Sequence, residues 1–176
     1  QTAYLKHFYP VEFMAAMLTS EQGNSDKVTF YISYCTEMGI KVLPPDINKS
    51  SDVFEVEDGG IRFSLAAIKN VGRGIVKSSV MERTEGGDFK SLTDFCVRMK
   101  SRELNKRTLE GLIKCGAFDF TGGNRMQLLA SYEGILSGAS KDQKNNLEGQ
   151  MDLFASSGED DREDVFLDIA DCPAKL

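Results

Sequence analysis

Apolar side chains recur every three or four positions in the first twenty residues, which is the period of a helix buried on one face. Pro10 divides this run, because proline ends one helix but is tolerated at the first position of the next. We therefore expect two core-facing helices, over residues 1–9 and residues 11–19. The apolar positions of the first helix are Tyr4, Leu5, Phe8 and Tyr9.

A third helix and then a break in helical structure are predicted next. Ser25 can cap the third helix, and Gly39 suits the left-handed position just after its end. Pro44 and Pro45 then exclude a helix and favour extended backbone before them. We expect an extended crossing between two parts of the molecule, with a boundary near residue 50.

Alternating apolar and polar residues over residues 54–57 and residues 61–63 predict two short strands. Between them lies Asp58-Gly59-Gly60, a sequence typical of a tight hairpin turn. One face of this two-stranded ribbon is apolar and needs a cover. The nearest candidate is a helix that we expect over residues 64–70.

The sequence IKNVGRGIVKS at residues 68–78 predicts a glycine-bearing turn between two helices. Gly72 and Gly74 permit positive φ and close approach of a partner, and Val71 is expected to tuck beneath the turn. The amides of residues 74–76 would lack partners within the second helix and carry the positive end of its dipole, which suits a phosphate. Such a helix-hairpin-helix grips a nucleic-acid backbone without reading bases. The alternative is a plain turn between two helices.

A second pair of helices is predicted within residues 91–116, with Ser91 capping the first and Asn105 the second. Lys106 and Arg107 fall in the first turn of the second helix, where cations oppose the helix dipole unless an anion binds. We interpret this pair as a degenerate helix-hairpin-helix whose turn lacks glycines, so that the two motifs would contact the backbone at two points. An ordinary helical hairpin with surface lysines is the alternative.

One more helix is predicted to begin at Gly123 or Asn124, and its apolar spacing stops after Leu136. Residues 137–148 are small and polar, and residues 156–164 are small and acidic. Neither stretch can bury enough apolar surface to offset the entropy of ordering, so we expect a disordered acidic C-terminal tail.

A short apolar peptide interrupts this tail. Its methionine, leucine and phenylalanine, in a disordered setting, are typical of a segment that becomes ordered when its side chains enter a groove of another protein. A pentapeptide of this kind also arises often by chance. It consists of Gln150, Met151, Asp152, Leu153 and Phe154.

Charge is distributed unevenly along the chain, although the formal net charge is -6. Residues 148–176 contain nine acidic and two basic side chains, whereas residues 62–114 contain twelve basic and six acidic ones. The basic excess thus surrounds the predicted hairpins. This distribution favours a protein that binds the nucleic-acid backbone, and a solvated basic surface is the alternative.

The composition excludes several other classes of protein. No apolar run is long enough for a membrane span, and the N-terminus, which lacks a methionine, resembles neither a signal peptide nor the start of a complete protein. One histidine, His7, and widely separated cysteines favour reduced cytoplasmic thiols over a zinc site or a disulfide framework. The cysteines are Cys35, Cys96, Cys115 and Cys172.

Seven sequence segments, in the same order along nearly the whole chain, resemble the alpha subunits of bacterial DNA polymerase III, the replicative polymerases of the C family. They are AYLKHFYPVEFMAA at residues 3–16, GIKVLPPD at 39–46, GIRF at 60–63, AAIKNVG at 66–72, FKSL at 89–92, NKR at 105–107 and IKCGAFD at 113–119.

The resemblance implies a division of the chain into three parts. Residues 1–50 would be the last helices of the fingers, and residues 51–137 a tandem helix-hairpin-helix domain that holds duplex DNA behind the active site. Residues 138–176 would be a linker and tail whose residues 150–154 dock on the sliding clamp, with Leu153 and Phe154 in an apolar pocket. The acidic Mg²⁺ ligands of the family's polymerising centre, and its OB-fold, have no counterpart here.

We therefore expect a mainly α protein, a helical bundle with a tandem helix-hairpin-helix and a small β-hairpin. It would be a non-catalytic part of a cytoplasmic DNA-directed DNA polymerase, without a cofactor of its own, that binds double-stranded DNA and the clamp within a replisome. The main alternative is a helical protein-interaction module that binds no DNA; a nuclease or ligase fragment lacks supporting carboxylate or lysine motifs. The candidate DNA-binding residues are Lys69, Asn70, Val71, Gly72, Arg73, Gly74, Ile75, Val76, Lys77, Asn105, Lys106 and Arg107.

Overall fold

The computed structural model describes residues 2–99 and 104–147, with side chains as far as residue 136. The mainly α-helical class with a small sheet is confirmed, and the acidic tail, including the candidate clamp peptide, lies outside the described residues. The elements are α1 (Thr2–Phe8), α2 (Pro10–Ser20), α3 (Ser25–Glu37), β1 (Val42–Leu43), β2 (Glu55–Glu57), β3 (Gly60–Arg62), the 3₁₀ turn η1 (Leu65–Ala67), α4 (Arg73–Gly86), α5 (Leu92–Arg98), α6 (Lys106–Lys114), the 3₁₀ turn η2 (Asp119–Thr121) and α7 (Arg125–Leu147).

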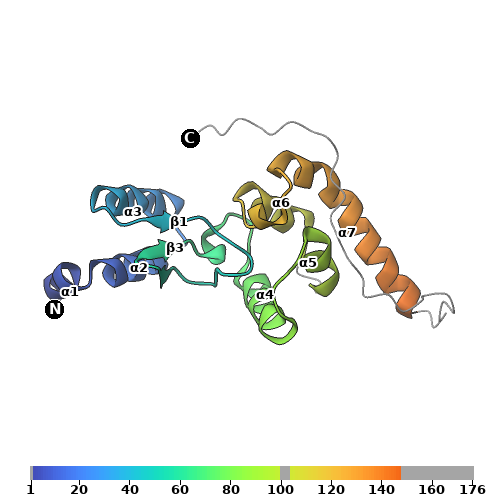
Figure 1. Ribbon diagram of the computed structural model, residues 1–176, viewed down its shortest axis with the longest axis horizontal. Helices are drawn as coiled ribbons and strands as arrows, with labels where there is room; N and C mark the ends of the chain where they lie inside the picture. Colours follow the sequence, from blue (N-terminus) through green and yellow to red (C-terminus); the bar gives the residue numbers. More distant parts are fainter. Residues whose placement is uncertain (1, 100–103, 148–176) are drawn as a thin grey trace.

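Two hydrophobic cores lie one after the other along the long axis of the molecule (Figure 1). The N-terminal core joins α2, α3 and the sheet, and the C-terminal core joins η1 with α4 to α7. Fully buried members of the first include Leu18, Cys35 and Ile61. Those of the second include Phe95, Leu109, Leu112, Ile113 and Phe118.

Helix α1 forms as predicted, but the expectation that it faces a core is wrong. It contacts only α2 among the stronger packing partners in the described chain, and it buries none of its residues. Tyr4 and Phe8 are each 58% exposed. Helical spacing shows that one face is apolar, but it contains no information on what covers that face.

Helices α2 and α3 pack against each other as expected. Pro10 occupies the first turn of α2, and Met14 and Leu18 are buried. The cap of α3 is one residue earlier than predicted: Asn24 Oδ1, not Ser25, accepts the amides of Asp26 and Lys27 at 3.1 and 3.2 Å. An Asn side chain competes well for this position because its carbonyl oxygen reaches these amides.

The predicted β-hairpin is present, and Asp58 and Gly59 form its two-residue turn with φ of 51° and 74°. The sheet has a third strand that was not predicted, because β1 pairs in parallel with β3 to give the order β1-β3-β2. Gly60 permits this pairing, since a Cβ there would lie 2.6 Å from the Lys41 carbonyl oxygen.

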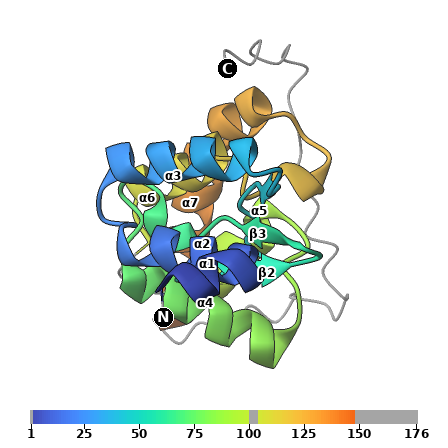
Figure 2. The ribbon, with the colours of Figure 1, turned by 90° about the vertical axis from the view of Figure 1, so that its left-hand side faces the viewer.

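The cover of the sheet also differs from the prediction. Helix α2 contacts β2 and β3, which lie beside it in the end view of Figure 2. The Phe54 amide donates to Thr19 Oγ1 at the end of α2 at 3.0 Å. The helix expected over residues 64–70 is only the single turn η1, capped by Ser64. Helix α2 has a longer apolar face than η1, so it covers the sheet in place of the helix predicted over residues 64–70.

The crossing after β1 is extended at its prolines, as predicted, and residues 46–50 then form a turn in which the Ser50 amide donates to the Asp46 carbonyl at 2.8 Å. This turn is tied to the C-terminal core. Ile47 is buried there. Arg83 Nη1 donates to the carbonyls of Ile47 and Ser50 at 2.7 and 2.8 Å. Asn48 exchanges two hydrogen bonds with the backbone of Phe89, at 2.8 and 2.9 Å. These contacts fix the crossing against α4 and α5.

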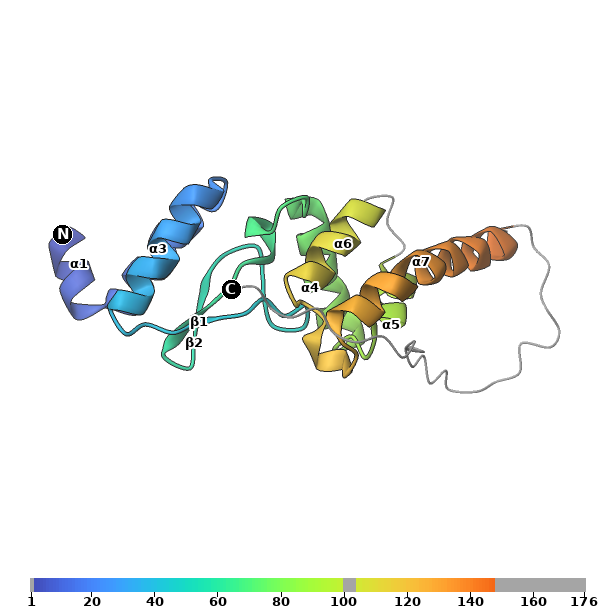
Figure 3. The same ribbon diagram turned by 90° about the horizontal axis from the view of Figure 1, so that it is seen from above.

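Helix α7 begins where predicted but is longer than predicted. Asn124 and Gln127 each accept the other's amide at 2.8 Å, which is a capping box at its start. The backbone remains helical to Leu147, eleven residues past Leu136, and runs away from the other helices in Figure 3. Alanine, lysine and glutamine in this stretch are good helix formers, so an existing helix can propagate without burial.

Candidate nucleic-acid interface

The turn that precedes α4 has the expected position but a different backbone conformation. Neither Gly72 nor Gly74 has positive φ, whereas Asn70 has a φ of 67°. Asparagine tolerates this left-handed region better than most residues do. Thr108 Oγ1, from the first turn of α6, donates to the Asn70 carbonyl at 2.9 Å and so fixes the turn.

The start of α4 presents open backbone amides. Gly72 is the N-cap residue, and no side chain caps the helix. The amides of Arg73, Gly74 and Ile75 therefore have no partner within α4. The expectation for Val76 is wrong, because its amide donates to the Gly72 carbonyl at 3.3 Å and begins the helical hydrogen-bond pattern. The open set lies one residue earlier than predicted because the helix begins at Arg73.

The underside of the turn packs onto α6. Val71 is buried in the C-terminal core, as predicted from its place in the turn. Gly111 of α6 allows the close approach, since a Cβ there would lie 2.9 Å from the Lys69 carbonyl oxygen. The orientation of the open amides is therefore set by contacts with another helix.

Basic side chains around this turn lack the ion pairs that several other basic residues of the described chain form. Lys69, Arg73 and Lys77 are exposed, and none of them pairs with a carboxylate in the described part of the chain. Arg73 and Lys77 lie one helical turn apart on the same face of α4. Cations paired elsewhere include Arg62 with Glu57, Arg98 with Glu82, Lys106 with Glu133, Lys114 with Glu110 and Arg125 with Asp119.

The second pair of helices is present as α5 and α6, and residues 100–103 between them lie outside the described residues. Both predicted caps are confirmed: Ser91 Oγ accepts the Asp94 amide, and Asn105 Oδ1 accepts the Thr108 amide, each at 3.0 Å. Lys106 Nζ lies 3.1 Å from Glu133. The start of α6 is thus largely supplied with partners from the protein itself.

Arg107 is the exception in the second hairpin, because it lies beside the first turn. It lines an open hollow of about 330 Å³ together with Lys69 and Asn70. The structure thus brings together one predicted residue of the second hairpin and two of the first. The other lining residues are Ile68, Glu110, Gly111, Lys114 and Cys115.

Sequence reasoning missed Glu110 and Lys114 in this hollow. Their ion pair spans 2.5 Å, and it raises the pKa of Lys114 above its ordinary value. Cys115 is exposed as a residue, but partial desolvation of its thiol by the neighbouring side chains raises the thiol pKa above its ordinary value. The signal in the sequence was helical spacing, since residues 107, 110, 111 and 114 share one face of α6.

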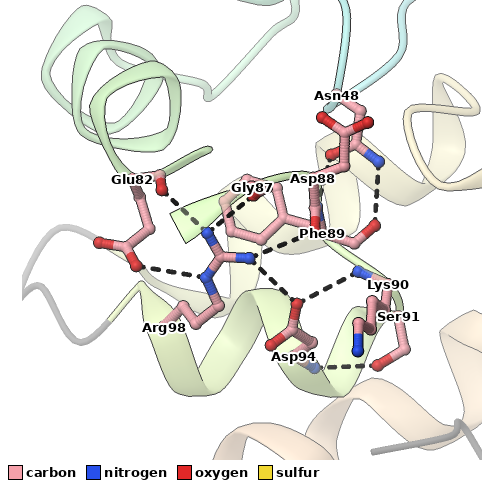
Figure 4. Close-up of polar contacts among 9 residues, drawn as sticks. All are labelled: Asn48, Glu82, Gly87, Asp88, Phe89, Lys90, Ser91, Asp94 and Arg98. Carbon is pink, nitrogen blue, oxygen red and sulfur yellow. Dashed lines mark hydrogen bonds and ion pairs between the residues drawn. The ribbon is translucent and has the colours of Figure 1, made fainter. Parts of the chain in front are cut away.

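A network of hydrogen bonds and ion pairs holds the C-terminal end of α4 against α5 (Figure 4). Arg98 Nη2 donates to the carbonyls of Glu82 and Gly87 at 2.8 and 2.9 Å. Its guanidinium also pairs with the Glu82 and Asp94 carboxylates and lies 4.4 Å from the centre of the Phe89 ring. Arg98 is therefore committed to the fold, and it does not add to the free charge at the turn.

Metal and membrane sites are not indicated by the described residues. None of their histidine, cysteine, aspartate and glutamate side chains gather in a group of three or more that could hold a metal ion. Cys35, Cys96 and Cys115 are not joined by disulfides within the described residues, and Cys172 lies outside them. No helix in the described ranges combines the length and apolar character that a membrane crossing requires.

The family model described as a helix-hairpin-helix motif matches residues 39–128. The chain belongs to this family. The matched range contains both hairpins, the sheet strands β2 and β3, and the crossing that ties the sheet to α4.

Several much longer proteins are similar to most of this chain, and all are named DNA polymerase III subunit alpha. The one from Thermus aquaticus is 48% identical over 155 residues, which are 88% of this chain and 13% of that protein. The one from Escherichia coli strain K12 is 42% identical over 161 residues, 91% of this chain and 14% of that protein. The one from Vibrio cholerae is 38% identical over 179 residues, with 100% of this chain and 15% of that protein covered. The expected resemblance is confirmed, and the chain spans about a seventh of the length of such relatives.

Proposed function

We propose that the helix-hairpin-helix of this chain holds double-stranded DNA by its sugar-phosphate backbone, without sequence preference. The observation that supports this function is the coincidence of open amides with unpaired cations at the start of α4. Elsewhere in the C-terminal core, most basic side chains are used in ion pairs. Cations kept free beside a helix start suit an anionic ligand of repeating charge.

The binding mechanism uses two neighbouring points of contact. One phosphate is held by the amides of Arg73, Gly74 and Ile75, with Lys69 and Lys77 at its sides. A second phosphate along the same strand is held by Arg107. The remaining candidates, among them Asn105 and Lys106, set the local geometry more than they contact the backbone, because they already have partners within the protein.

The chain then acts as a part of a longer replicative polymerase, as the names of its relatives suggest. Residues 1–50 would belong to the fingers, residues 51–137 would hold the duplex, and residues 138–176 would form a tether. DNA-directed DNA synthesis and its Mg²⁺ ions would reside in other regions of the longer protein. The described residues contain no carboxylate cluster to hold such ions.

Titration of a fluorescent duplex at 50 and 200 mM salt tests the proposal. Four backbone contacts, by Lys69, Arg73, Lys77 and Arg107, predict a slope of log affinity against log salt of about -3.6 and a loss of affinity of roughly 150-fold. Two duplexes of unrelated sequence should bind equally. An affinity that is insensitive to salt, or strongly dependent on sequence, would exclude backbone binding.

We also propose that Gln150, Met151, Asp152, Leu153 and Phe154 tether the chain to the sliding clamp. Leu153 and Phe154 are the apolar anchors, and a few anchors provide most of the binding energy of such a peptide. Changing both to alanine should abolish retention of the chain by immobilised clamp. The matched control changes Phe166 and Leu167, another apolar pair of the same tail, and should be retained normally. Equal retention of both double variants would refute the tether.

The alternative is a module that recruits proteins and binds no DNA. The exposed apolar residues of α1 favour contact with protein, and Phe8 is 58% exposed. Under this alternative the labelled duplex would show no change in anisotropy at either salt concentration. The titration therefore separates the two functions.

A further inference from the structure

A buried glutamine from the N-terminal part of the chain contacts the candidate DNA-binding turn. Gln22 follows α2, and it is only 8% exposed. Its carboxamide nitrogen donates to Ser64 Oγ and to the Asp52 carbonyl, each at 3.2 Å. Its oxygen accepts a hydrogen bond from Arg73 Nη2 at 2.7 Å. The first residue of α4 is thus held by a side chain that lies about fifty positions earlier in the sequence.

The surroundings allow only this orientation of the carboxamide. The opposite one would set its NH₂ group against the Arg73 guanidinium, donor against donor. It would also set its oxygen toward the Asp52 carbonyl, acceptor against acceptor. In the satisfied orientation, the Ser64 hydroxyl accepts from Gln22 and from the Ala66 amide.

The choice of partner distinguishes Arg73 from the other arginines of the C-terminal core and the sheet. Arg62, Arg98 and Arg125 are each paired with carboxylates. Arg83 donates to three backbone carbonyls. Among these described arginines, Arg73 alone is oriented by a hydrogen bond that it donates to a neutral side-chain amide. A carboxylate in this place would fix the guanidinium but cancel its charge, whereas an amide fixes it and leaves the charge intact.

We propose that Gln22 is a positioning residue for DNA binding: it orients the Arg73 guanidinium toward the duplex backbone without neutralising it. This inference rests on the proposed function. Arg73 has five N–H donors, and the bond to Gln22 uses only one of its two Nη2 hydrogens, so a phosphate can still be bound by two parallel hydrogen bonds. Pre-orientation lowers the entropy that a long side chain loses when it binds.

A double-mutant cycle on duplex affinity tests the inference in the full chain. Gln22→Met keeps the size of the side chain and removes the acceptor, and it should weaken binding by about fivefold at low salt, as for loss of one ordered charged contact. The slope of log affinity against log salt should stay unchanged, because no charge is lost. In an Arg73→Gln background, Gln22→Met should have no further effect. Equal effects in both backgrounds, or no effect in either, would overturn the inference.

A variant that adds a charge at position 22 changes the salt dependence of binding only if Gln22 acts on Arg73. A purely structural role of Gln22 would leave this salt dependence unchanged. Gln22→Glu keeps an acceptor but pairs with the arginine, and it should reduce the magnitude of the salt slope by about 0.9, the value for one lost phosphate contact. A slope equal to that of the wild type would overturn the inference. Circular dichroism and thermal unfolding confirm that each variant is folded before it is titrated.

A measurement on the unmodified chain keeps the inference testable if either variant unfolds. The side-chain N–H signals of Arg73, identified in nitrogen-15 spectra by their loss in Arg73→Gln, should show slowed rotation of the guanidinium in the free protein. Fast rotation would overturn the inference. Wild-type binding that depends on salt, combined with a silent Gln22→Met, would refute only the role of Gln22. Absence of duplex binding by the wild type would refute the proposed function as well.

Discussion

The starts of α4 and α6 are neighbours in the C-terminal core, where Thr108 of α6 is hydrogen-bonded to the turn before α4, but they have opposite local chemistry. At α4, Gly72 supplies no capping side chain and the nearby cations lack carboxylate partners. At α6, Asn105 caps the helix and Lys106 pairs with Glu133. Both starts are basic in sequence, but only the first lacks a side-chain cap, and at the second Arg107 is the one cation of the first turn without a carboxylate partner among the described residues. The difference shows that a basic helix start becomes a candidate anion site only when no capping side chain or carboxylate of the same protein already binds its amides and cations.

Removal of charge at the first start should have the largest effect. The double change Arg73→Gln with Lys77→Gln should weaken duplex binding by about 100-fold at low salt and lower the magnitude of the salt slope by about 1.8. Lys106→Gln at the second start should change affinity by less than about threefold, because its charge is already compensated. Fluorescence anisotropy at several salt concentrations measures both.

The matched control for that variant also removes two charges. Lys41 and Lys90 are exposed and form no ion pair with a described carboxylate. Lys90 follows the C-terminal end of α4, about 20 Å from the turn along the helix. Changing both to glutamine should leave the affinity nearly unchanged. If the control loses as much affinity as the double variant, binding depends on overall charge and the turn has no special role.

The contact between the turn and α6 predicts opposite effects for two changes of glycine to alanine. Gly111→Ala would place a Cβ 2.9 Å from the Lys69 carbonyl oxygen and should destabilise the fold by roughly 1 kcal/mol, despite better helix propensity. Gly134→Ala in α7 meets no atom within 4 Å and should stabilise by up to about 1 kcal/mol. Urea unfolding measures both. A stabilising Gly111→Ala would show that the turn is not pinned by α6.

Loss of the cap at the second start should affect stability and leave DNA binding unchanged. Asn105→Ala removes the acceptor of the Thr108 amide, and it should lower the free energy of unfolding by about 1 kcal/mol. Duplex affinity at a temperature where the variant is fully folded should stay within about twofold of the wild type. A large loss of affinity there would mean that Asn105 itself contacts DNA.

The smallest of these expected effects comes from giving α4 a side-chain cap like the one that Asn105 provides for α6. Gly72 has extended backbone, and a Cβ there meets no atom within 4 Å, so Gly72→Asn is tolerated. Its side chain would cap α4 and occupy an open amide, which should weaken duplex binding by about threefold while stability stays equal or rises by a few tenths of a kcal/mol. A variant that binds DNA as tightly as the wild type would show that these amides are not used.

Local patterns gave correct predictions where neighbouring residues decide the outcome. Pro10 starts α2, Asp58 and Gly59 form the hairpin turn, and Gly39 ends α3 with a φ of 73°. The predictions that were wrong depended on competition between distant segments. Helix α2 covers the sheet in place of residues 64–70. Strand β1 pairs in parallel with β3, and a parallel pairing has no turn sequence between its strands by which it could be predicted.

The sequence by itself determined most of the helices, the caps of α5 and α6, the hairpin and the basic excess near the turn, because each depends on residues within a few positions of one another. Only the tertiary structure decided which of the basic residues remain free, since ion pairs such as that of Lys106 with Glu133 join separate helices. It also placed Gln22 against Arg73 and Arg107 beside Lys69. The physical reason is that a basic side chain can bind a ligand only if folding does not place a carboxylate beside it. The carboxylates that do so come from segments far away in the sequence.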